Sequence, residues 1–287
     1  MYYKKENFLN KLTDNSLNLN SYELAIADYI KENYKKVSFL DMIDVSKILS
    51  IETSYIISYI NKLEFRDFEE FRNTIREYSM SELKSTDRFE FSLININPKI
   101  NNVKNLILEK EISNLNKLKN NFNEFTFYSM LEEIIKAPEI IVVGTRSSSI
   151  IAIYFEHMLK KIGKKTTKII SGATEYLDNF SLFDDSTLVI SIGFARYPKE
   201  TIRIVNFFKK HNFKVVSITD NEMSALTPLS DIVFTIPCES ISITDFYATP
   251  ISVINIIIVL LSQIDTEGSK RYLNKFEEVA KDFGFYF

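Results

Sequence analysis

The feature that most constrains the fold is a change of pattern after Pro138. From there, short runs rich in Val and Ile alternate with longer helical segments, one ending near Gly163, a good helix C-cap, and one running from Pro198 to His211. Such apolar runs are typical of strands buried on both faces, and alternation with helices favours a parallel sheet. This half of the chain therefore predicts an α/β fold with a doubly wound parallel sheet, followed by a long apolar helix and a last amphipathic helix. The predicted strands are EIIVV, KKTTKII, TLVISI, FKVVSIT and DIVFTI.

The first 80 residues show helical periodicity only. Helices this short must pack together to be stable, so we expect an all-helical domain. The second and third helices are separated by SIETS, which predicts a tight turn in which Thr53 or Ser54 caps the next helix. Two short helices joined so closely indicate a helix-turn-helix. The four apolar stripes are Ile26, Ala27, Ile30 and Tyr34; Met42, Val45 and Leu49; Ile56, Ile60 and Leu63; and Phe68, Phe71 and Ile75.

Between these halves lies a polar stretch that ends at Pro98, followed by an Asn- and Lys-rich helical stretch and by TFYSMLEEIIKAP. We place the domain boundaries by this change in composition. The prediction is a helix-turn-helix domain at 1–80, a linker with a linking helix at 81–125, and an α/β domain with its C-terminal helix at 126–287.

Composition and charge exclude several classes of protein. The chain has 45% hydrophobic and 25% charged residues, which is ordinary for globular proteins, and its net charge of −3 provides no general attraction to nucleic acid or membranes. A single cysteine, Cys238, and two distant histidines favour neither a disulfide nor a zinc site. The longest apolar run, ISVINIIIVLL, is shorter than the roughly 18 residues of a membrane span. We expect a soluble cytoplasmic protein without metal or cofactor.

Three segments reach the carboxyl edge of the predicted sheet: 144–149, 193–198 and 219–224. In an open parallel sheet, ligands bind at this edge, where helix N-termini present unpaired N–H groups. The first segment adds the hydroxyls of Ser147, Ser148 and Ser149 and the guanidinium of Arg146, which suit a phosphate or carboxylate. The alternative is that the serines only cap the helix.

The order of these parts, with their loops, resembles the RpiR family of bacterial transcription regulators, in which a helix-turn-helix precedes a sugar isomerase (SIS) domain. The resemblance covers nearly the whole chain. At the N-terminus it depends on LNSYELAIADYIKENYKKVSFLDMIDVSKILSIETSYIISYINKLEFRDFEEFRNTI, where A-x-YI, KLEF and F-x-x-F have the family's spacing. At the C-terminus it depends on VVGTRSSSIIAIYFEHMLKKIGK, VISIGFARYPKETIRIVNFFKKHNFKVVSITDNEMSALTPLSDIVFTIP and TDFYATPISVINIIIVLL.

This resemblance implies a function. The SIS domain would sense a phosphorylated sugar or a related anionic carbohydrate metabolite, and the helix-turn-helix would bind a double-stranded DNA operator as part of a homodimer or homotetramer. SIS domains also occur in enzymes, so a sugar phosphate isomerase is one alternative. A sensor that no longer binds DNA is another.

The ligand loops depart from the family pattern. Where the first loop commonly reads Gly-x-Gly-x-Ser, Arg146 replaces the second glycine; where the second reads Ser-x-Ser-Gly-x-Thr-x-Glu, this chain has GFARYPKE and lacks two hydroxyls. Our hypothesis is that Arg146 and Arg196 supply the anion contacts. Alternatively, these arginines pair with carboxylates such as Glu175 or Asp178 and the pocket is vestigial. The predicted ligand-binding residues are Gly144, Arg146, Ser147, Ser148, Gly193, Arg196, Tyr197 and Thr219.

The same departures count against catalysis. Isomerisation of a sugar needs an acid and a base, for which Glu200, His157 and His211 are the candidates. Glu200 is in the first turn of a predicted helix and His211 at the end of one, positions that the helix dipole favours without any catalytic role. We therefore predict no catalytic residue and no enzyme activity.

The predicted DNA-binding domain is acidic. Residues 1–80 hold 11 basic and 13 acidic side chains, a net charge of −2. Because phosphate neutralisation supplies most non-specific DNA affinity, such a domain should bind weakly unless dimerisation helps. Lys35, Lys36, Lys62, Arg66 and Arg72 could form a local basic rim, or be solvated charges of a domain that binds no DNA. By the resemblance, the recognition helix runs over about 53–63, with groove-facing residues Thr53, Ser54, Tyr55, Ser58, Tyr59 and Lys62.

Overall fold

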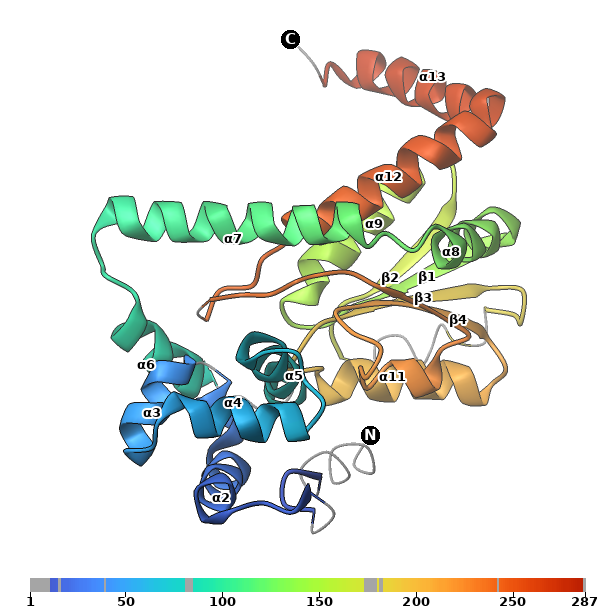
Figure 1. The fold of residues 1–287 in the computed structure, drawn as a ribbon. Coiled ribbons are helices and arrows are strands. Elements are labelled where there is room, and N and C mark those ends of the chain that lie inside the picture. Colours follow the sequence, from blue (N-terminus) through green and yellow to red (C-terminus); the bar gives the residue numbers. More distant parts are fainter. Residues whose placement is uncertain are drawn as a thin grey trace. The chain divides into compact units, whose positions relative to one another are not determined.

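The computed structural model describes residues 11–14, 17–38, 40–80, 85–172, 180, 183–241 and 243–285. The chain divides into two compact units, Met1–Asn95 and Ile96–Phe287 (Figure 1). The first unit is all helical and the second is built on a parallel sheet, which confirms the predicted fold class. The domain boundaries at residues 80 and 125 stay predictions.

Among the described residues, the N-terminal unit includes the four predicted helices and a further one in the stretch that we expected to be a linker. The apolar stripes read from the sequence lie on the first four helices and form one buried cluster around Ile26, Ile56 and Phe71. The helices α3 and α4 are joined by the tight turn of a helix-turn-helix. The helices are α2 (Ser21–Val37), α3 (Met42–Leu49), α4 (Thr53–Lys62), α5 (Phe68–Met80) and α6 (Ser85–Asn95).

Capping residues explain where the first two of these helices begin. Asn20 and Glu23 form a reciprocal capping box at the start of α2. The start of α4 differs from the prediction, because Glu52 is at the N-cap and makes no side-chain cap hydrogen bond. Thr53 is already the first helical residue, so the expectation that Thr53 or Ser54 caps α4 is wrong. The turn is made instead by Ser50, which ends α3 with a left-handed backbone at φ 53°.

The C-terminal unit has five parallel strands in the order β2-β1-β3-β4-β5, as a doubly wound sheet requires. The strands match the five predicted runs to within one or two residues at each end. They are β1 (Glu139–Val143), β2 (Lys165–Ile169), β3 (Leu188–Gly193), β4 (Lys214–Thr219) and β5 (Ile232–Thr235). The helices are α7 (Ile100–Asn120), α8 (Glu124–Lys136), α9 (Ser148–Lys161), α11 (Lys199–Lys210), η3 (Thr227–Leu229), α12 (Ala248–Ile264) and α13 (Thr266–Phe283).

Helices cover both faces of the sheet (Figure 1). Alternate residues of β1 point to opposite faces, so Ile140 packs in the cluster with α8, α9 and α12, whereas Ile141 packs in the cluster with α11. Apart from Glu139 and Lys214 at their first positions, the residues of β1, β3 and β4 are buried, because both faces of these strands are covered. The only open part of such a sheet is its edge.

The strand order defines where that edge opens. From β1 the chain moves outward to β2, and it then returns to β3 on the other side of β1. The loops after β1 and β3 therefore diverge, and ligands of open α/β sheets bind in the crevice that this reversal creates. The two predicted anion loops follow these two strands.

Gly163 confirms the predicted end of α9. It follows the helix with φ +90°, and a Cβ atom there would lie 2.2 Å from the ring of Tyr272 in α13. Of the helices that the structure describes, none by itself has the length and apolarity needed to cross a membrane; α12 and α13 meet that test only as a pair, bent by 104°.

Candidate functional site

The first loop, after β1, lies close to the backbone at the start of α9 and at the end of β2. Gly144 is buried, and a Cβ atom there would lie 2.9 Å from the carbonyl oxygen of Ser148. Its N–H donates to the carbonyl of Ile169 in β2 at 3.0 Å. Gly144 is therefore needed to bring the loop against the first turn of α9.

Arg146 stands in this loop with a left-handed backbone, at φ 57°, and its side chain is exposed. This conformation is unfavourable by about 1–2 kcal/mol for a residue with a Cβ atom, and such strain collects at functional sites. Among the described residues, Arg146 forms no salt bridge. Its suggested partners Glu175 and Asp178 lie outside the described residues.

The serines of the first loop differ in their surroundings. Ser147 is exposed at the N-cap of α9 but makes no side-chain cap hydrogen bond, whereas Ser148 is buried. Its side chain lies close to Tyr247, the residue before α12, where it lowers the pKa of the phenol while burial raises it. The alternative that these serines only cap the helix is therefore not supported for Ser147.

The second loop, after β3, repeats the strained geometry of the first. Arg196 is exposed with φ 67°, and Pro198 at the N-cap of α11 makes no side-chain cap hydrogen bond. At Gly193 a Cβ atom would lie 2.7 Å from Leu226. A buried hydrogen bond of 2.7 Å between the hydroxyls of Thr145 and Thr201 ties the first loop to α11. Two exposed arginines thus stand at the ends of neighbouring strands, each beside a helix N-terminus.

A hydrogen-bond network ties the second loop to the end of β4. The hydroxyl of Tyr197 donates to Asp220 at 2.5 Å and accepts from the Asn221 amide at 3.2 Å, while Thr219 donates to Asp220 at 3.2 Å. Burial raises the pKa of the Asp220 carboxyl and of the Tyr197 phenol. Thr219 is fully buried. Tyr197 and Thr219, predicted as ligand contacts, are thus held by the chain itself, and the sequence analysis missed Asp220, which directly follows the predicted strand.

The segment between β5 and α12 is held at the same edge by α7. Glu239 accepts from Lys110 at 2.5 Å and forms a second ion pair with Lys117, and the Asn114 amide donates to the Glu239 carbonyl at 3.0 Å. Burial raises the pKa of Glu239, but the hydrogen bonds from the two lysines outweigh this effect and lower it to about 2. From the sequence we expected α7 to be a linking helix, and these contacts with Glu239 were not predicted.

The candidates for acid–base chemistry are spread apart. His157 is exposed in α9, nine residues along the helix from Ser148 or about 13 Å at 1.5 Å per residue. His211 follows the C-terminal end of α11, at the opposite edge of the sheet, where its Nδ1 lies 2.8 Å from the Phe207 carbonyl oxygen. Of the three candidates only Glu200, in the first turn of α11, lies near the loops. Among the described residues there is no His, Cys, Asp and Glu group suited to a metal ion.

The predicted DNA-binding residues fall into two groups. Ser54 and Ser58 are exposed on α4, and Thr53 and Tyr55 are partly exposed. Tyr59 is fully buried, with its hydroxyl donating to the Leu12 carbonyl at 2.9 Å, so its expected position facing the groove is wrong. A buried aromatic ring contributes more to the core of so small a domain than it could on its surface.

Lys62 is tied to its own domain. Its ammonium group lies 2.7 Å from a carboxylate oxygen of buried Glu23, whose other oxygen accepts from Ser58 at 2.7 Å. The exposed stripe of α4 also includes Ile57 and Asn61, which complete the spacing i, i+3, i+4, i+7 from Ser54 and which the sequence analysis missed.

The predicted basic rim is largely neutralised. Arg66 lies 2.9 Å from Asp67, and Arg72 lies 3.9 Å from Glu69. The Lys35 ammonium group lies 5.8 Å from the centre of the Tyr34 ring, and Lys36 is exposed. The rim therefore offers less positive charge to a phosphate backbone than the count of basic residues suggests.

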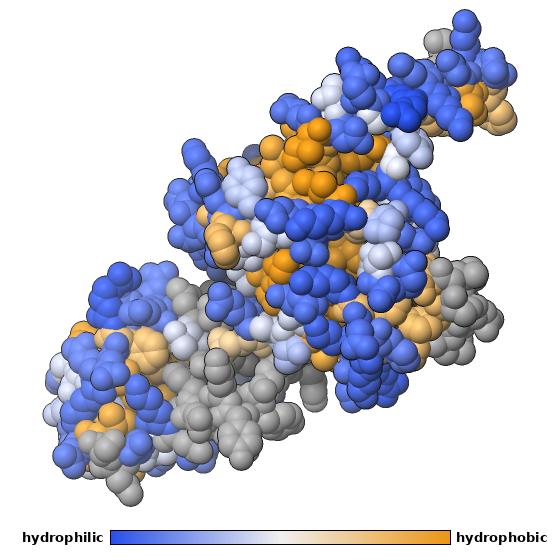
Figure 2. Space-filling view, turned by 90° about the vertical axis from the view of Figure 1, so that its right-hand side faces the viewer, coloured by the Kyte–Doolittle hydropathy of each residue, from blue (hydrophilic) through white to orange (hydrophobic). Residues whose placement is uncertain are grey.

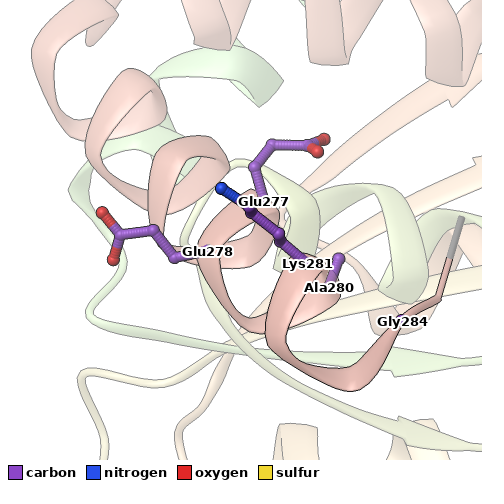
Figure 3. Close-up of a pocket in the computed structure, with 5 residues that line it drawn as sticks. All are labelled: Glu277, Glu278, Ala280, Lys281 and Gly284. Atoms are coloured by element: carbon purple, nitrogen blue, oxygen red, sulfur yellow. The ribbon is translucent and has the colours of Figure 1, made fainter.

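A pocket also lies on α13, away from the strand ends. It is lined by Glu277, Glu278, Ala280, Lys281 and Gly284, all from the end of one helix, and Figure 3 shows the two glutamates pointing away from each other. One exposed helix end with diverging side chains does not bring groups together on a ligand.

Comparisons with known proteins agree with this geometry. Residues 133–260 match the family model of the SIS domain. An uncharacterized HTH-type transcriptional regulator of Clostridium perfringens is 22% identical over 213 residues, which are 73% of this chain and 74% of that protein.

Two solved structures share the fold. The sugar isomerase domain of an RpiR transcription factor from Sphaerobacter thermophilus aligns with a TM-score of 0.58 and 20% identity, over 60% of this chain and 97% of that chain. The NanR protein of Vibrio vulnificus, complexed with ManNAc-6P, aligns with a TM-score of 0.58 and 18% identity, over 96% of this chain and 98% of that chain.

Proposed function

We infer that this chain, an RpiR-like protein that carries an SIS domain over residues 133–260, is a DNA-binding transcriptional regulator that senses a phosphorylated sugar or a related anionic carbohydrate metabolite. The observation that carries this proposal is the pair of exposed arginines, Arg146 and Arg196, each held with positive φ at the carboxyl end of a neighbouring strand.

The chemistry of this edge suits an anion. Neither the N-cap of α9 nor that of α11 makes a side-chain cap hydrogen bond. In α9 the N–H groups of Ser149 and Ile150 donate to the carbonyls of Arg146 and Ser147, so we propose that the N–H groups of the first turn of α11 bind the anionic ligand. A guanidinium beside each helix can bind two oxygens of a phosphate or carboxylate at once. We propose that these groups replace the hydroxyls that the second loop lacks.

A second copy of the chain is part of the proposal. An operator with two half-sites matches a two-fold symmetric protein. Large apolar side chains are exposed on α9 and α12, and Figure 2 shows apolar surface gathered on this side of the molecule. This supports a homodimer that covers these helices through Ile150, Ile153, Ile256, Val259 and Ile264.

A sugar phosphate isomerase is the competing function, and the description of the Sphaerobacter relative's domain as a sugar isomerase domain favours it. Glu200 would have to work at the loops without either histidine. We propose sensing instead of catalysis. Exchange of the C2 hydrogen of glucose 6-phosphate, or of a C1 hydrogen of fructose 6-phosphate, with deuterated solvent would contradict this proposal.

DNA binding is the part that separates a regulator from a sensor acting through other partners. The exposed stripe of α4 carries no charged side chain, so we expect weak binding that depends on the dimer and changes little with salt. An electrophoretic shift with the promoter of the protein's own gene, at low and moderate salt, tests this. No shift in the presence of any sugar phosphate would contradict the regulator.

The ligand site is tested by thermal unfolding with a panel of sugar phosphates. A ligand at about 100 times its Kd adds about 2.7 kcal/mol to the stability of the folded state. In the double variant Arg146→Ala and Arg196→Ala we expect this stabilisation to disappear. The matched control is Arg203→Ala with Arg271→Ala, which removes the same charge from exposed positions on α11 and α13. Unchanged affinity in the first variant would contradict the proposed site.

A further inference from the structure

Near the start of α12, two buried side-chain oxygen atoms, one from α7 and one from α12, have no hydrogen-bond partner among the described residues. They are Oε2 of Glu111, on α7, and Oγ1 of Thr249, whose side chain is fully buried; neither has a hydrogen-bond partner among the residues that the structure describes. The other carboxylate oxygen of Glu111 lies 3.5 Å from the N–H of Ala248, the residue before Thr249. A buried oxygen without a donor is unfavourable by about 1–3 kcal/mol, and native proteins hold few of them.

These atoms adjoin the candidate anion site. Tyr247, directly before α12, lies close to Ser147 of the first loop, whose side chain lowers the pKa of the Tyr247 phenol while burial raises it. The chain between β5 and α12 starts at the same edge of the sheet, because the N–H of Ile236 donates to the carbonyl of Thr219 at 2.8 Å. The Cys238 thiol then donates to the carbonyl of Phe246, the residue before Tyr247, at 2.9 Å. Asp220, the residue after Thr219, holds Tyr197 of the second loop.

The edge therefore has two chemically different ends. Arg146 and Arg196 present positive charge and N–H donors, whereas Glu111 and Thr249 present buried oxygen atoms that accept hydrogen bonds. A sugar phosphate has the complementary arrangement, with an anionic group at one end and hydroxyl or ammonium donors along the rest of the molecule.

We propose that Glu111 and Thr249 bind the donor-bearing part of the ligand, its hydroxyl or ammonium groups, so that α7 forms one wall of the binding site. This inference depends on the proposed function, because it assumes that an anionic sugar derivative occupies the loops. It goes beyond it by assigning a ligand contact to a helix outside the strand-end loops.

The assignment links the ligand to the first helix after the boundary between the two units. Lys110, Asn114 and Lys117 on α7 hold Glu239, and Glu111 stands on the same helix. A ligand that supplies the missing donors to Glu111 strengthens the attachment of α7 to the SIS domain. Because coupling is a difference in affinity between two states, a ligand can bias the regulator only through contacts of this kind.

The experiment compares conservative variants against two classes of probe. The variants are Glu111→Gln and Thr249→Val, and the control is Glu109→Gln, the same charge change at an exposed position on α7. The probes are inorganic phosphate and three sugar phosphates: glucose 6-phosphate, glucosamine 6-phosphate and N-acetylmannosamine 6-phosphate. Affinity is measured by calorimetry and by thermal shift.

We expect each variant to weaken binding of the sugar phosphates by 10-fold or more, while affinity for inorganic phosphate changes by less than 2-fold. A loss shared by all sugar phosphates assigns the contact to hydroxyls, and a larger loss for glucosamine 6-phosphate in Glu111→Gln assigns it to an ammonium group. Thr249→Val should leave the melting temperature of the free protein unchanged or raise it, because the hydroxyl it removes has no partner.

Sugar phosphate affinity within 2-fold of the wild type in both variants would overturn the inference, as would an equal loss for inorganic phosphate or a clear fall in melting temperature for Thr249→Val. Such results would show that the Glu111 and Thr249 oxygens bind water or stabilise the fold, and do not contact the ligand. If the wild-type protein binds inorganic phosphate but none of the sugar phosphates, the proposed function itself fails and this inference fails with it.

Discussion

The helix-turn-helix and the carboxyl edge of the sheet differ in whether their buried polar groups have hydrogen-bond partners. In the N-terminal unit, the carboxylate of Glu23 is almost fully buried, and it receives hydrogen bonds from Lys62, Ser58 and the N–H of Asn20. At the sheet edge, Glu111 and Thr249 keep buried oxygens without a donor, and two arginines are held in strained conformations.

This difference separates polar groups that already have a partner within the chain from polar groups that have none. A charge that is satisfied by its own chain stabilises the domain, and it is then not available to a partner. A group left incomplete in a folded domain is available to a ligand. Lys62, which the sequence analysis assigned to DNA, belongs to the first kind, and Arg146 belongs to the second.

The largest effect is expected from breaking the complete network. Lys62→Met leaves Glu23 buried without its cation, and we expect the N-terminal unit to lose about 3 kcal/mol of stability, since removing one partner strands a buried charge. Hydrogen exchange of the amides in α2 and α4 measures this. Lys47→Met, at an exposed position on α3, is the control. If the α2 and α4 amides were equally protected in Lys62→Met and Lys47→Met, the ion pair between Lys62 and Glu23 would not stabilise the unit.

The same network predicts a dependence on pH. Burial raises the pKa of Glu23, but the hydrogen bonds from Lys62, Asn20 and Ser58 lower it to below its ordinary value of 4.5. A carboxyl group with a lowered pKa contributes stability above pH 4.5, and the contribution is lost as the pH falls through the folded-state pKa. Hydrogen exchange in α2 should therefore increase as the pH falls below 4.5, after correction for the intrinsic rate. A flat profile in the wild type would contradict this assignment.

A smaller effect is expected where the sheet edge is tied to itself. Tyr197→Phe removes the donor to the partly buried Asp220, and we expect a loss of about 1–3 kcal/mol in the free energy of unfolding of the SIS domain, because the carboxyl is left short of a donor. Tyr128→Phe, at an exposed position on α8, should change it by less than about 0.5 kcal/mol. Equal values for the two variants would show that the network contributes nothing.

The strained loops should respond in the opposite direction. Glycine adopts positive φ without penalty, so Arg146→Gly and Arg196→Gly should each raise the stability of the free protein by about 0.5–1 kcal/mol while weakening ligand binding. Chemical denaturation with and without ligand separates the two effects. A variant that loses stability and keeps its affinity would sink the idea that the arginines are strained for the sake of a ligand.

The smallest effect on stability is expected on the exposed stripe of α4. Asn61→Ala should change stability by less than about 0.5 kcal/mol but weaken DNA binding by about 1–3 kcal/mol, because a side chain on the exposed stripe can reach base edges. Tyr59→Phe should lower stability and leave DNA binding unchanged, since the Tyr59 hydroxyl donates to the Leu12 carbonyl inside the domain. Gel shifts paired with thermal unfolding test both variants; the converse pattern would restore Tyr59 as the contact residue.

Much of the fold could be predicted because its signals are local. Runs such as EIIVV predicted strands to within two residues, and the stripes around Ile26 and Ile56 predicted helices that the structure contains. The positions of the two anion loops followed from where the predicted strands end, since Gly144 directly follows one buried strand and Gly193 ends another. Periodicity and strand ends are properties of neighbouring residues, so one chain suffices to read them.

The sequence by itself determined the two kinds of unit, the parallel sheet and the types of residue that stand at its carboxyl edge. Only the tertiary structure decided which polar groups are already used. Lys62 meets Glu23 across 39 residues, and Lys110 meets Glu239 across 129, distances at which no local pattern reports a contact. Those long-range partners determine whether a charged side chain is paired within the chain or is available to bind a ligand. Burial and pairing, not residue type, set the free energy of a polar group.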